Sequence, residues 1–240
     1  MRRRIDLLLV EKGFAKSMEQ ARALILAGEV LVNETVVDKA GSLVSEDASI
    51  RLLEKPPFVS RGGIKLAHAL DQFRLDVTSL VALDVGASTG GFTDCLLQRG
   101  ASRVYAVDVG YGQLDYRLRT DPRVVVMERV NARYSFSLPE KADLATIDLS
   151  FISLEKVVPN VARLVKPGGK IICLVKPQFE AGRDQVGKGG LVKDPLVHAR
   201  VLGRFISWAI AKGFRVGGLT PSLILGASGN REFFILLKVS

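Results

Sequence analysis

Seven apolar runs alternate with helix-like segments over residues 80–240, and each run is short enough to be a buried strand. The runs lie at Val81–Val85, Arg103–Asp108, Arg123–Met127, Ala142–Asp148, Lys170–Lys176, Phe214–Leu219 and Glu232–Val239. Helices are expected between them, at about Gly90–Gln98, Leu154–Leu164 and Pro195–Lys212. Strands that alternate with helices and close on a final hairpin predict an α/β fold with a doubly wound, mostly parallel seven-stranded sheet.

Residues 1–58 have a different pattern, which predicts a small α+β domain in front of a second domain over residues 59–240. Ser17 and Gln20 have the spacing of a capping box at the start of a helix over Met18–Ala27. A shorter helix is expected before it, with apolar residues from Ile5 to Phe14 on one face. Short strands are expected within Glu29–Val37 and Ser49–Leu53. The pair Pro56-Pro57 indicates an extended linker over residues 54–59.

The stretch Val81–Asp94 combines the first strand of the second domain, a turn with three glycines and the start of a helix. Glycine lets a ligand approach the backbone, and free N–H groups at a helix start can receive a polar group. The three glycines do not have the G-x-G-x-x-G spacing of a dinucleotide site. Asp84 at the end of the strand suits a ligand with a positive end, and Asp108 at the end of the next strand is placed to bind ribose hydroxyls. Both acids together favour S-adenosylmethionine over a dinucleotide or a turn that serves packing alone.

Charged residues also stand at other positions where a sheet of this kind binds ligands. Asp148 and Lys176 end two further strands, at the edge where doubly wound sheets hold their ligands. Lys65 follows the pair Gly62-Gly63, which predicts a turn, and is expected to start a helix that runs to about Phe73. The helix dipole disfavours a lysine at that point, so the placement favours a functional role.

The ten residues Asp84–Thr93, Asp-Val-Gly-Ala-Ser-Thr-Gly-Gly-Phe-Thr, resemble the cofactor loop of the TlyA (haemolysin A) family of rRNA methyltransferases. That family is related to the FtsJ-type ribose 2′-O-methyltransferases, and the resemblance covers nearly the whole chain. It implies a Rossmann-like, class I fold that transfers a methyl group from S-adenosylmethionine to a ribose 2′-hydroxyl of ribosomal RNA, with cytidine as the nucleotide. The cofactor-binding residues that it implies are Asp84, Gly86, Ser88, Thr89, Gly90, Gly91, Phe92, Asp108, Asn131 and Asp148.

Four charged residues match the Lys-Asp-Lys-Glu tetrad of the FtsJ-type enzymes, namely Lys65, Asp148, Lys176 and Glu232. The resemblance implies that Lys176 is the base or orients the hydroxyl, and that Lys65 holds the ribose. Two ammonium groups close to a sulfonium disfavour one another's charge, which allows a lysine to act as a base. The two carboxylates would hold the lysines in place. Which lysine removes the proton stays open at this point.

The first domain resembles the ribosomal S-four-type RNA-binding module. The resemblance rests on Arg4–Ser17, Ala21-Arg22, Ile25, Ala27–Asn33 and Val37–Lys39. Glu34 departs from it, because the family usually has glycine there. The residues expected to contact RNA are Arg2, Arg3, Arg4, Lys12, Lys16, Arg22 and, at the start of the second domain, Arg61. Contacts of this kind to the phosphate backbone position an enzyme without reading bases.

Composition agrees with a polyanionic partner such as ribosomal RNA or a ribosomal subunit, because the formal net charge is +9.

Cys95 and Cys173 lie inside predicted elements and are expected to be buried thiols, not a disulfide or a metal site. A chain with only two histidines offers little for a histidine-based metal centre. No apolar run approaches the ~18 residues of a membrane span, so no membrane association is expected. The expected location is the cytoplasm.

Three alternatives remain beside the 2′-O-methyltransferase. The first is an RNA-binding protein on a methyltransferase fold without catalysis, and the intact tetrad argues against it. The second is a membrane-active haemolysin, which the short helices disfavour. The third is a base methyltransferase, but Asp148-Leu-Ser-Phe replaces the Asn-Pro-Pro-aromatic signature of exocyclic amine methylation. The substrate RNA and the oligomeric state stay open.

Overall fold

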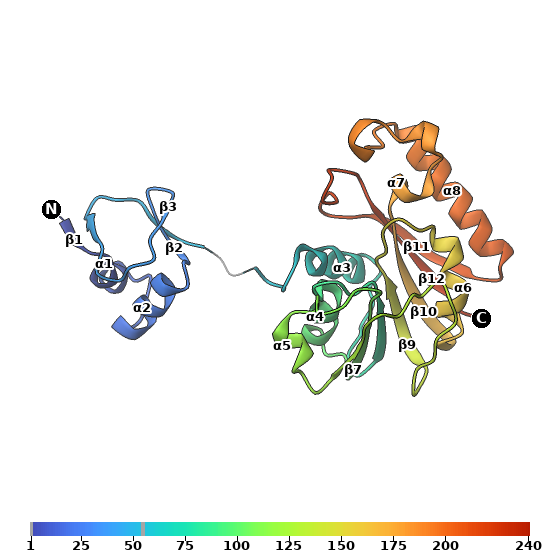
Figure 1. Cartoon of the computed structure of the whole chain (residues 1–240), viewed down its shortest axis with the longest axis horizontal. Coiled ribbons are helices and arrows are strands. Elements are labelled where there is room, and N and C mark those ends of the chain that lie inside the picture. Colours follow the sequence, from blue (N-terminus) through green and yellow to red (C-terminus); the bar gives the residue numbers. More distant parts are fainter. Residues whose placement is uncertain (1, 54–55) are drawn as a thin grey trace. The chain divides into compact units, whose positions relative to one another are not determined.

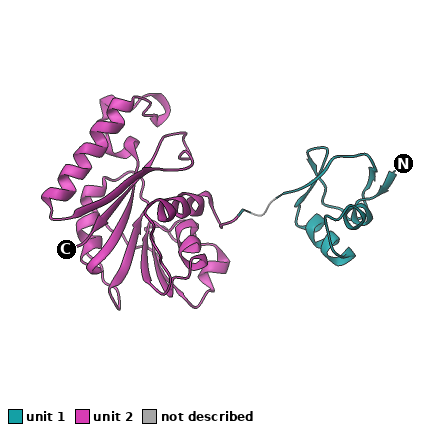
Figure 2. Cartoon of the chain, turned by 180° about the vertical axis from the view of Figure 1, so that it is seen from behind, with its two compact units in different colours: residues 1–56 teal, residues 57–240 magenta. Residues whose placement is uncertain are grey.

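The computed structural model describes residues 2–53 and 56–240, which form two compact units, Met1–Pro56 and Pro57–Ser240 (Figure 2). The boundary predicted after residue 58 lies slightly further along the chain. The linker predicted over residues 54–59 falls partly outside the described residues. No helix among the described residues is long and apolar enough to cross a membrane.

The first unit packs two helices against short antiparallel strands. Its elements are β1 (Arg2–Arg4), α1 (Ile5–Glu11), α2 (Met18–Leu26), β2 (Val30–Val32), β3 (Thr35–Val36), β4 (Leu43–Ser45) and β5 (Ile50–Leu52). The strands form one sheet in the order β3-β2-β5 and a separate pair, β1-β4. The Ser17 hydroxyl accepts a hydrogen bond from the Gln20 N–H at 3.2 Å, which confirms the predicted N-cap of α2. Neither strand of the β1-β4 pair was expected, because β1 consists of three arginines and carries no apolar pattern.

Asn33 and Glu34 form the turn between β2 and β3, and both have positive φ, +49° and +63°. This is the left-handed region, which glycine adopts without steric cost. Glu34 therefore occupies a backbone position suited to the glycine that the related modules have there. Its carboxylate forms an ion pair with Arg51 at 2.9 Å.

The second unit is a sheet with helices on both faces (Figure 1). Its strands are β6 (Val81–Val85), β7 (Arg103–Val107), β8 (Val124–Met127), β9 (Ala142–Ile147), β10 (Val165–Val175), β11 (Arg215–Pro221) and β12 (Phe233–Lys238). Its α-helices are α3 (Arg61–Gln72), α4 (Gly91–Gln98), α5 (Tyr116–Arg119), α6 (Val158–Ala162), α7 (Pro177–Glu180) and α8 (Pro195–Ala211), and short 3₁₀ turns cover Leu154–Lys156, Arg183–Gln185 and Lys188–Gly190.

The strand order is β11-β12-β10-β9-β6-β7-β8, and all neighbours are parallel except β12, which is antiparallel to both β10 and β11. This confirms the predicted seven-stranded, mostly parallel sheet with its final hairpin. Successive residues of a strand face opposite sides: Leu83 packs with the α6 and α8 side, and Ala82 with the α3 and α4 side. Cys95 and Cys173 are both buried and free, as expected.

The prediction that Gly62-Gly63 forms a turn and that Lys65 starts the helix is wrong. Helix α3 begins at Arg61, so both glycines lie in its first turn and Lys65 lies in its second. The glycines serve close packing instead: a Cβ on Gly63 would overlap the Cβ and Cγ atoms of Phe58. The dipole argument for a functional Lys65 therefore does not apply, and its role has to be judged from its contacts.

Two other predicted boundaries are wrong for local reasons. The helix predicted over Leu154–Leu164 is split into a 3₁₀ turn and α6, because Pro159 has no N–H and stands in the first turn of a new helix. The strand predicted from Lys170 begins at Val165, and the Pro167-Gly168-Gly169 segment forms an irregularity within β10, where the register with β9 shifts.

Gly63→Ala should destabilise the second unit by about 1–3 kcal/mol, because the added methyl group overpacks the contact between α3 and Phe58. The unfolding free energy from urea titration measures this effect. Gly203→Ala is the matched control, since Gly203 lies inside α8 with no neighbour that a Cβ would meet. It should be stabilising by up to about 1 kcal/mol. Equal effects of both substitutions would contradict the packing role of Gly63.

Candidate active site

The glycine turn between β6 and α4 is pressed against the end of the neighbouring strand β9. A Cβ on Gly86 would overlap the carbonyl oxygen of Asp148, and the φ of Gly86 is +87°. Gly90 also has a positive φ, +96°, and is the N-cap residue of α4. Glycine is therefore required at both positions. At Gly86 its absence of a side chain lets the turn lie directly beside Asp148.

Two cavities share Gly86 in their walls. The smaller, of about 170 Å³, is lined by Ser60, Arg61, Gly62, Lys65, Gly86, Ala87, Ser88, Thr89, Gly91, Phe92, Asp148 and Ala227. The larger, of about 720 Å³, includes Gly86, Asp108, Asn131, Ser150, Phe151, Gln178 and Phe179 in its wall. Gly86 lines both, and Asp148 in the first is followed in the chain by Leu149 in the second. The larger volume lies within the range of small-molecule sites, about 300–1,000 Å³.

The four tetrad residues form two lysine–carboxylate pairs at this edge. Lys65 pairs with Glu232 at 2.6 Å, and Lys176 pairs with Asp148 at 2.6 Å. Both pairs are largely buried. Asp148 and Lys176 follow the parallel strands β9 and β10, whereas Glu232 precedes β12. Because β12 is antiparallel, its beginning lies at the same edge of the sheet as the ends of β9 and β10.

Lys65 and Asp148 line the same small cavity, so one member of each pair faces a shared space. The structure thus brings together residues separated by up to 167 positions in the chain. Each ammonium group is held by a carboxylate, and no lysine–lysine contact is needed to assemble the group.

Asp108 and Asn131 both line the larger cavity, as their predicted cofactor role requires. The Asp108 carboxylate accepts hydrogen bonds from the Ser88 N–H at 2.8 Å and the Gly110 N–H at 2.7 Å. A carboxylate has about four acceptor sites, so these two bonds fix its orientation and leave capacity for hydroxyl donors. The Asn131 side-chain oxygen accepts a hydrogen bond from the Arg133 N–H at 3.0 Å.

Asp84 does not point into either cavity, contrary to the expectation from its place at the end of β6. It is completely buried on the α4 side of the sheet and accepts hydrogen bonds from the hydroxyls of Thr93 at 2.7 Å and Thr146 at 2.9 Å. Burial raises the pKa of Asp84 to about 6, and the two hydroxyls oppose that rise. Its predicted contact with a cationic ligand stays a prediction, and its visible contacts hold α4 to the sheet beneath the turn.

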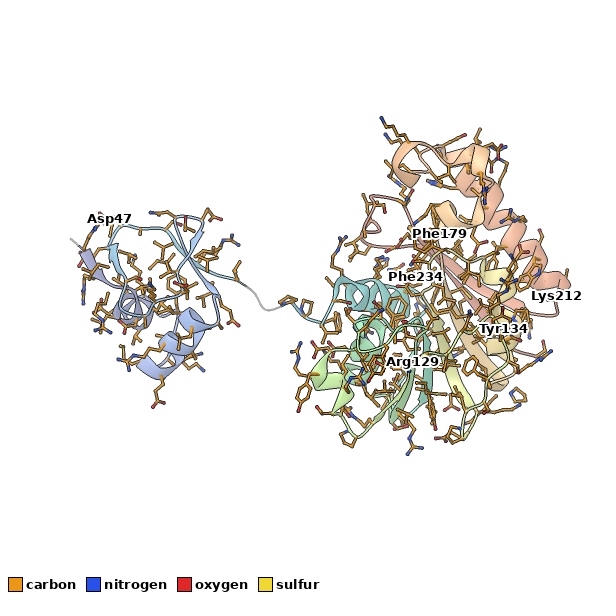
Figure 3. All side chains as sticks on the ribbon, viewed as in Figure 1. Asp47, Arg129, Tyr134, Phe179, Lys212 and Phe234 are labelled. Carbon is orange, nitrogen blue, oxygen red and sulfur yellow. The ribbon has the colours of Figure 1, made fainter. Side chains whose placement is uncertain are left out.

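Several residues of the site carry no signal in the hydrophobic pattern. The Lys176 ammonium group also donates to the Ser150 hydroxyl at 3.1 Å, and the Phe151 and Phe179 rings lie 4.8 Å apart (Phe179 is labelled in Figure 3). Phe151 is 90% exposed and has a φ of +63°. From the sequence, an exposed phenylalanine after a strand cannot be told from a core residue.

The predicted RNA-binding residues of the first unit are only partly on its helices. Arg2, Arg3 and Arg4 lie on β1 and not on a helix. Lys12 donates to the Glu46 carbonyl at 2.7 Å, Lys16 precedes α2, and Arg22 lies on α2. In the second unit, Arg61 lines the small cavity and donates to the Leu225 carbonyl at 2.8 Å.

Asp6, which was not predicted, organises two of these arginines. It is completely buried and pairs with Arg4 at 2.7 Å and with Arg22 at 3.6 Å. The hydrogen bond from Arg4 holds the pKa of Asp6 below its usual range. A carboxylate at the start of α1 is compatible with the helix dipole, so it gave no separate signal in the sequence.

Comparison with known proteins agrees with this arrangement. Residues 58–239 match the FtsJ-like methyltransferase family, and residues 3–50 match the S4 domain. The chain belongs to the TlyA family of FtsJ-like methyltransferases. The predicted fold class, that of S-adenosylmethionine-dependent methyltransferases, is confirmed for this TlyA-family chain.

Three similar proteins span nearly the whole chain. The Bacillus subtilis protein YqxC, a candidate rRNA methyltransferase, is 50% identical over 98% of this chain and 85% of its own length. The 16S/23S rRNA (cytidine-2′-O)-methyltransferase TlyA of Mycobacterium tuberculosis is 44% identical over 99% of this chain and 90% of its own. A solved structure of a candidate hemolysin from Streptococcus thermophilus is 43% identical, covers 100% of this chain and 89% of its own, and has a TM-score of 0.76.

The buried state of Asp84 makes a pH-dependent prediction. Because its folded pKa of about 6 lies above the ordinary value of 3.8, this group favours the folded state below about pH 4 and loses that contribution as the pH rises through 6. The loss is on the order of 3 kcal/mol. Urea unfolding at pH 4 and pH 7 should therefore show that Asp84→Asn gains stability relative to the wild type at the higher pH.

Asp121→Asn is the control of opposite sign. A hydrogen bond from Arg123 lowers the pKa of Asp121, so this group contributes stability that is lost as the pH falls. Relative to the wild type, Asp121→Asn should therefore be less stable at pH 7, and this difference should shrink only as the pH falls below about 4. The same sign for both variants would refute the assignment for Asp84.

Proposed function

We propose that this chain transfers a methyl group from S-adenosylmethionine to the 2′-hydroxyl of a cytidine in ribosomal RNA. The observation that carries the proposal is the placement of two buried lysine–carboxylate pairs beside a glycine turn that needs glycine at Gly86. Relatives named as rRNA (cytidine-2′-O)-methyltransferases support the nucleotide and the class of RNA. A substrate of this kind would place the enzyme in the cytoplasm.

The larger cavity fits the proposed cofactor in size and in the polarity of its wall. Asp108 would bind the ribose hydroxyls, and Asn131 would lie near the adenine. The bend at Gly86 and the start of α4 would face the amino-acid part, with Ser88, Thr89, Gly91 and Phe92 in the adjoining wall. S-adenosylmethionine, when bound there, would supply a methyl group on a positively charged sulfur, with neutral S-adenosylhomocysteine as the leaving group when the ribose oxygen takes the methyl group.

The chain's own residues must hold the ribose hydroxyl and remove its proton. Lys176 is fixed by Asp148 and by the Ser150 hydroxyl, so its ammonium group has a defined position. Lys65 is fixed by Glu232 and faces the shared small cavity. We assign Lys176 to the hydroxyl, as its base or its orienting group, and Lys65 to the binding of the ribose or its phosphate.

The first unit would bring the enzyme to its RNA. Arg4 and Arg22 share the buried carboxylate of Asp6, which holds both side chains at one place on the surface. Arginine is suited to phosphate because its planar group donates several hydrogen bonds. The S4 domain match and the net charge of +9 support this assignment.

Lys176→Ala should lower the transfer of labelled methyl to ribosomal RNA by at least about 100-fold, because it removes the group that handles the hydroxyl proton. Binding of S-adenosylmethionine, measured by calorimetry, should persist. Lys212→Ala is the control, since Lys212 is an exposed residue at the end of α8 (labelled in Figure 3). Nucleoside analysis of the product should show 2′-O-methylcytidine.

Each other outcome has a distinct meaning. Retained transfer in Lys176→Ala removes this lysine from the mechanism. If the wild-type chain binds RNA but does not bind S-adenosylmethionine and transfers no labelled methyl group, it is an RNA-binding protein without catalysis. A methylated base in the nucleoside analysis would reject the ribose as the acceptor.

A further inference from the structure

Two neighbouring segments at the edge of the sheet are tied together at three successive points. One is Asp148–Leu154, which follows β9, and the other is Lys176–Glu180, which follows β10. The first tie is Lys176 with Asp148 and Ser150. The second is the contact between the Phe179 and Phe151 rings. The third, farthest along both segments, is made by Glu180.

Glu180 is the last residue of α7 and its side chain is almost completely buried. One carboxylate oxygen accepts a hydrogen bond from the Ser153 hydroxyl at 2.8 Å, and the other accepts one from the Leu154 N–H at 2.7 Å. Arg204 of α8 lies 3.6 Å from the carboxylate and donates to the Glu180 carbonyl at 2.5 Å. Glu180 therefore joins the segment after β9, helix α7 and helix α8.

A buried carboxylate is an expensive way to stabilise a fold, because the charged form loses its hydration. That cost shows in the raised pKa of Glu180, whose largest cause is burial. An apolar residue of similar size would pack α7 against α8 without that cost, but it could not hydrogen-bond Ser153 and Leu154. A bidentate acceptor, by contrast, fixes the orientation of the Ser153–Leu154 backbone.

The segment that Glu180 holds is strained and lines the cofactor cavity. Phe151 has a φ of +63°, in a backbone region that is unfavourable for a non-glycine residue and persists only where the surroundings impose it. The segment Leu149–Ser153 forms part of the wall of the 720 Å³ cavity. Its two ends are held by Lys176, through Asp148 and Ser150, and by Glu180, through Ser153 and Leu154.

We propose that Glu180 is a positioning residue for methyl transfer: it fixes the segment Asp148–Leu154 against α7 so that Asp148 and Lys176 keep the geometry needed at the ribose hydroxyl. The inference rests on the proposed function. Glu180 does not line the large cavity, although residues on both sides of it, Phe179 and Ala181, do. It therefore acts through the Asp148–Lys176 pair and not by contact with the reactants.

The test compares Glu180→Ala, Glu180→Gln and Glu155→Ala in the full chain. Glutamine can accept from the Leu154 N–H and donate to the Ser153 hydroxyl, so it should keep the tie without the charge. Glu155 also approaches Arg204, at 3.6 Å, but it is only partly buried, and among the described residues its carboxylate accepts no hydrogen bond from Ser153 or Leu154. Glu155→Ala is therefore the matched control for a change next to Arg204.

Glu180→Ala should lower kcat for methyl transfer by 10-fold or more, with the KM for RNA changed less than threefold. Glu180→Gln and Glu155→Ala should stay within threefold of the wild type in kcat. Hydrogen exchange of the peptide covering residues 149–157 should accelerate in Glu180→Ala alone. The fluorescence of Trp208, which stacks with Phe205 and Phe214, should stay unchanged in all three and so report intact packing of α8.

An unchanged kcat in Glu180→Ala overturns the proposal. So does a Gln variant as damaged as the Ala variant, because the role would then be the charge and not the tie. A kcat loss accompanied by a shift in Trp208 fluorescence also overturns it, since the defect would be general misfolding. If the wild type transfers no methyl group to ribosomal RNA, the proposed function fails, and hydrogen exchange alone then decides whether Glu180 holds the segment.

Discussion

The site depends on one close approach between two backbones, that of the turn after β6 and that of the end of β9. Residue 86 can lie against the Asp148 carbonyl only because it has no side chain. Gly86 lines both cavities, and Asp148, on the other strand of this contact, lines the smaller one. The parallel register of β6 and β9, with Val85 opposite Ile147, brings these two chain segments to the same level.

The charges around this contact are arranged as neutral pairs. An isolated ammonium group in a largely buried position would be costly, and a carboxylate at hydrogen-bond distance offsets that cost while fixing the side chain. Lys65 lies on α3 and Lys176 directly follows β10, and each is held by its own carboxylate. Asp84 differs from these carboxylates, because its hydrogen-bond partners are two hydroxyls. Burial therefore raises its pKa, and the hydroxyls only partly oppose the rise. Asp84 lies within β6 beneath α4, whereas Asp148 follows β9 and lines the small cavity beside Lys176, so acids at similar sequence positions have different partners.

The strand pattern of the second unit could be read from the sequence, because buried parallel strands are short apolar runs between helices. The ends of those strands, and hence Asp108, Asp148 and Lys176, followed from the same pattern. The partner of each lysine could not be predicted, since Glu232 precedes a strand whose antiparallel direction only the hairpin reveals. Resemblance to a family supplied Glu232, and the structure supplied its contact with Lys65.

Other features escaped prediction for physical reasons. Gly62-Gly63 looked like a turn because helix interiors usually disfavour glycine, and only the proximity of Phe58 explains their place in α3. Asp84 was placed at the correct strand end, but a shift of one residue along a strand reverses the face, and α4 covers the face that Asp84 occupies. Ser150 and Phe151 belong to an irregular segment, where no periodicity exists to read.

The place of β12 in the sheet limits the order in which the second unit can fold. Strand β12 follows β11 in the chain, yet in the sheet it lies between β10 and β11, and Glu232 immediately precedes it. While β12 is missing, the edge of β10 has no partner strand on that side, and Lys65 has not yet met the Glu232 carboxylate. The sheet can therefore close, and Lys65 can gain its partner, only after residues 232–238 have inserted beside β10.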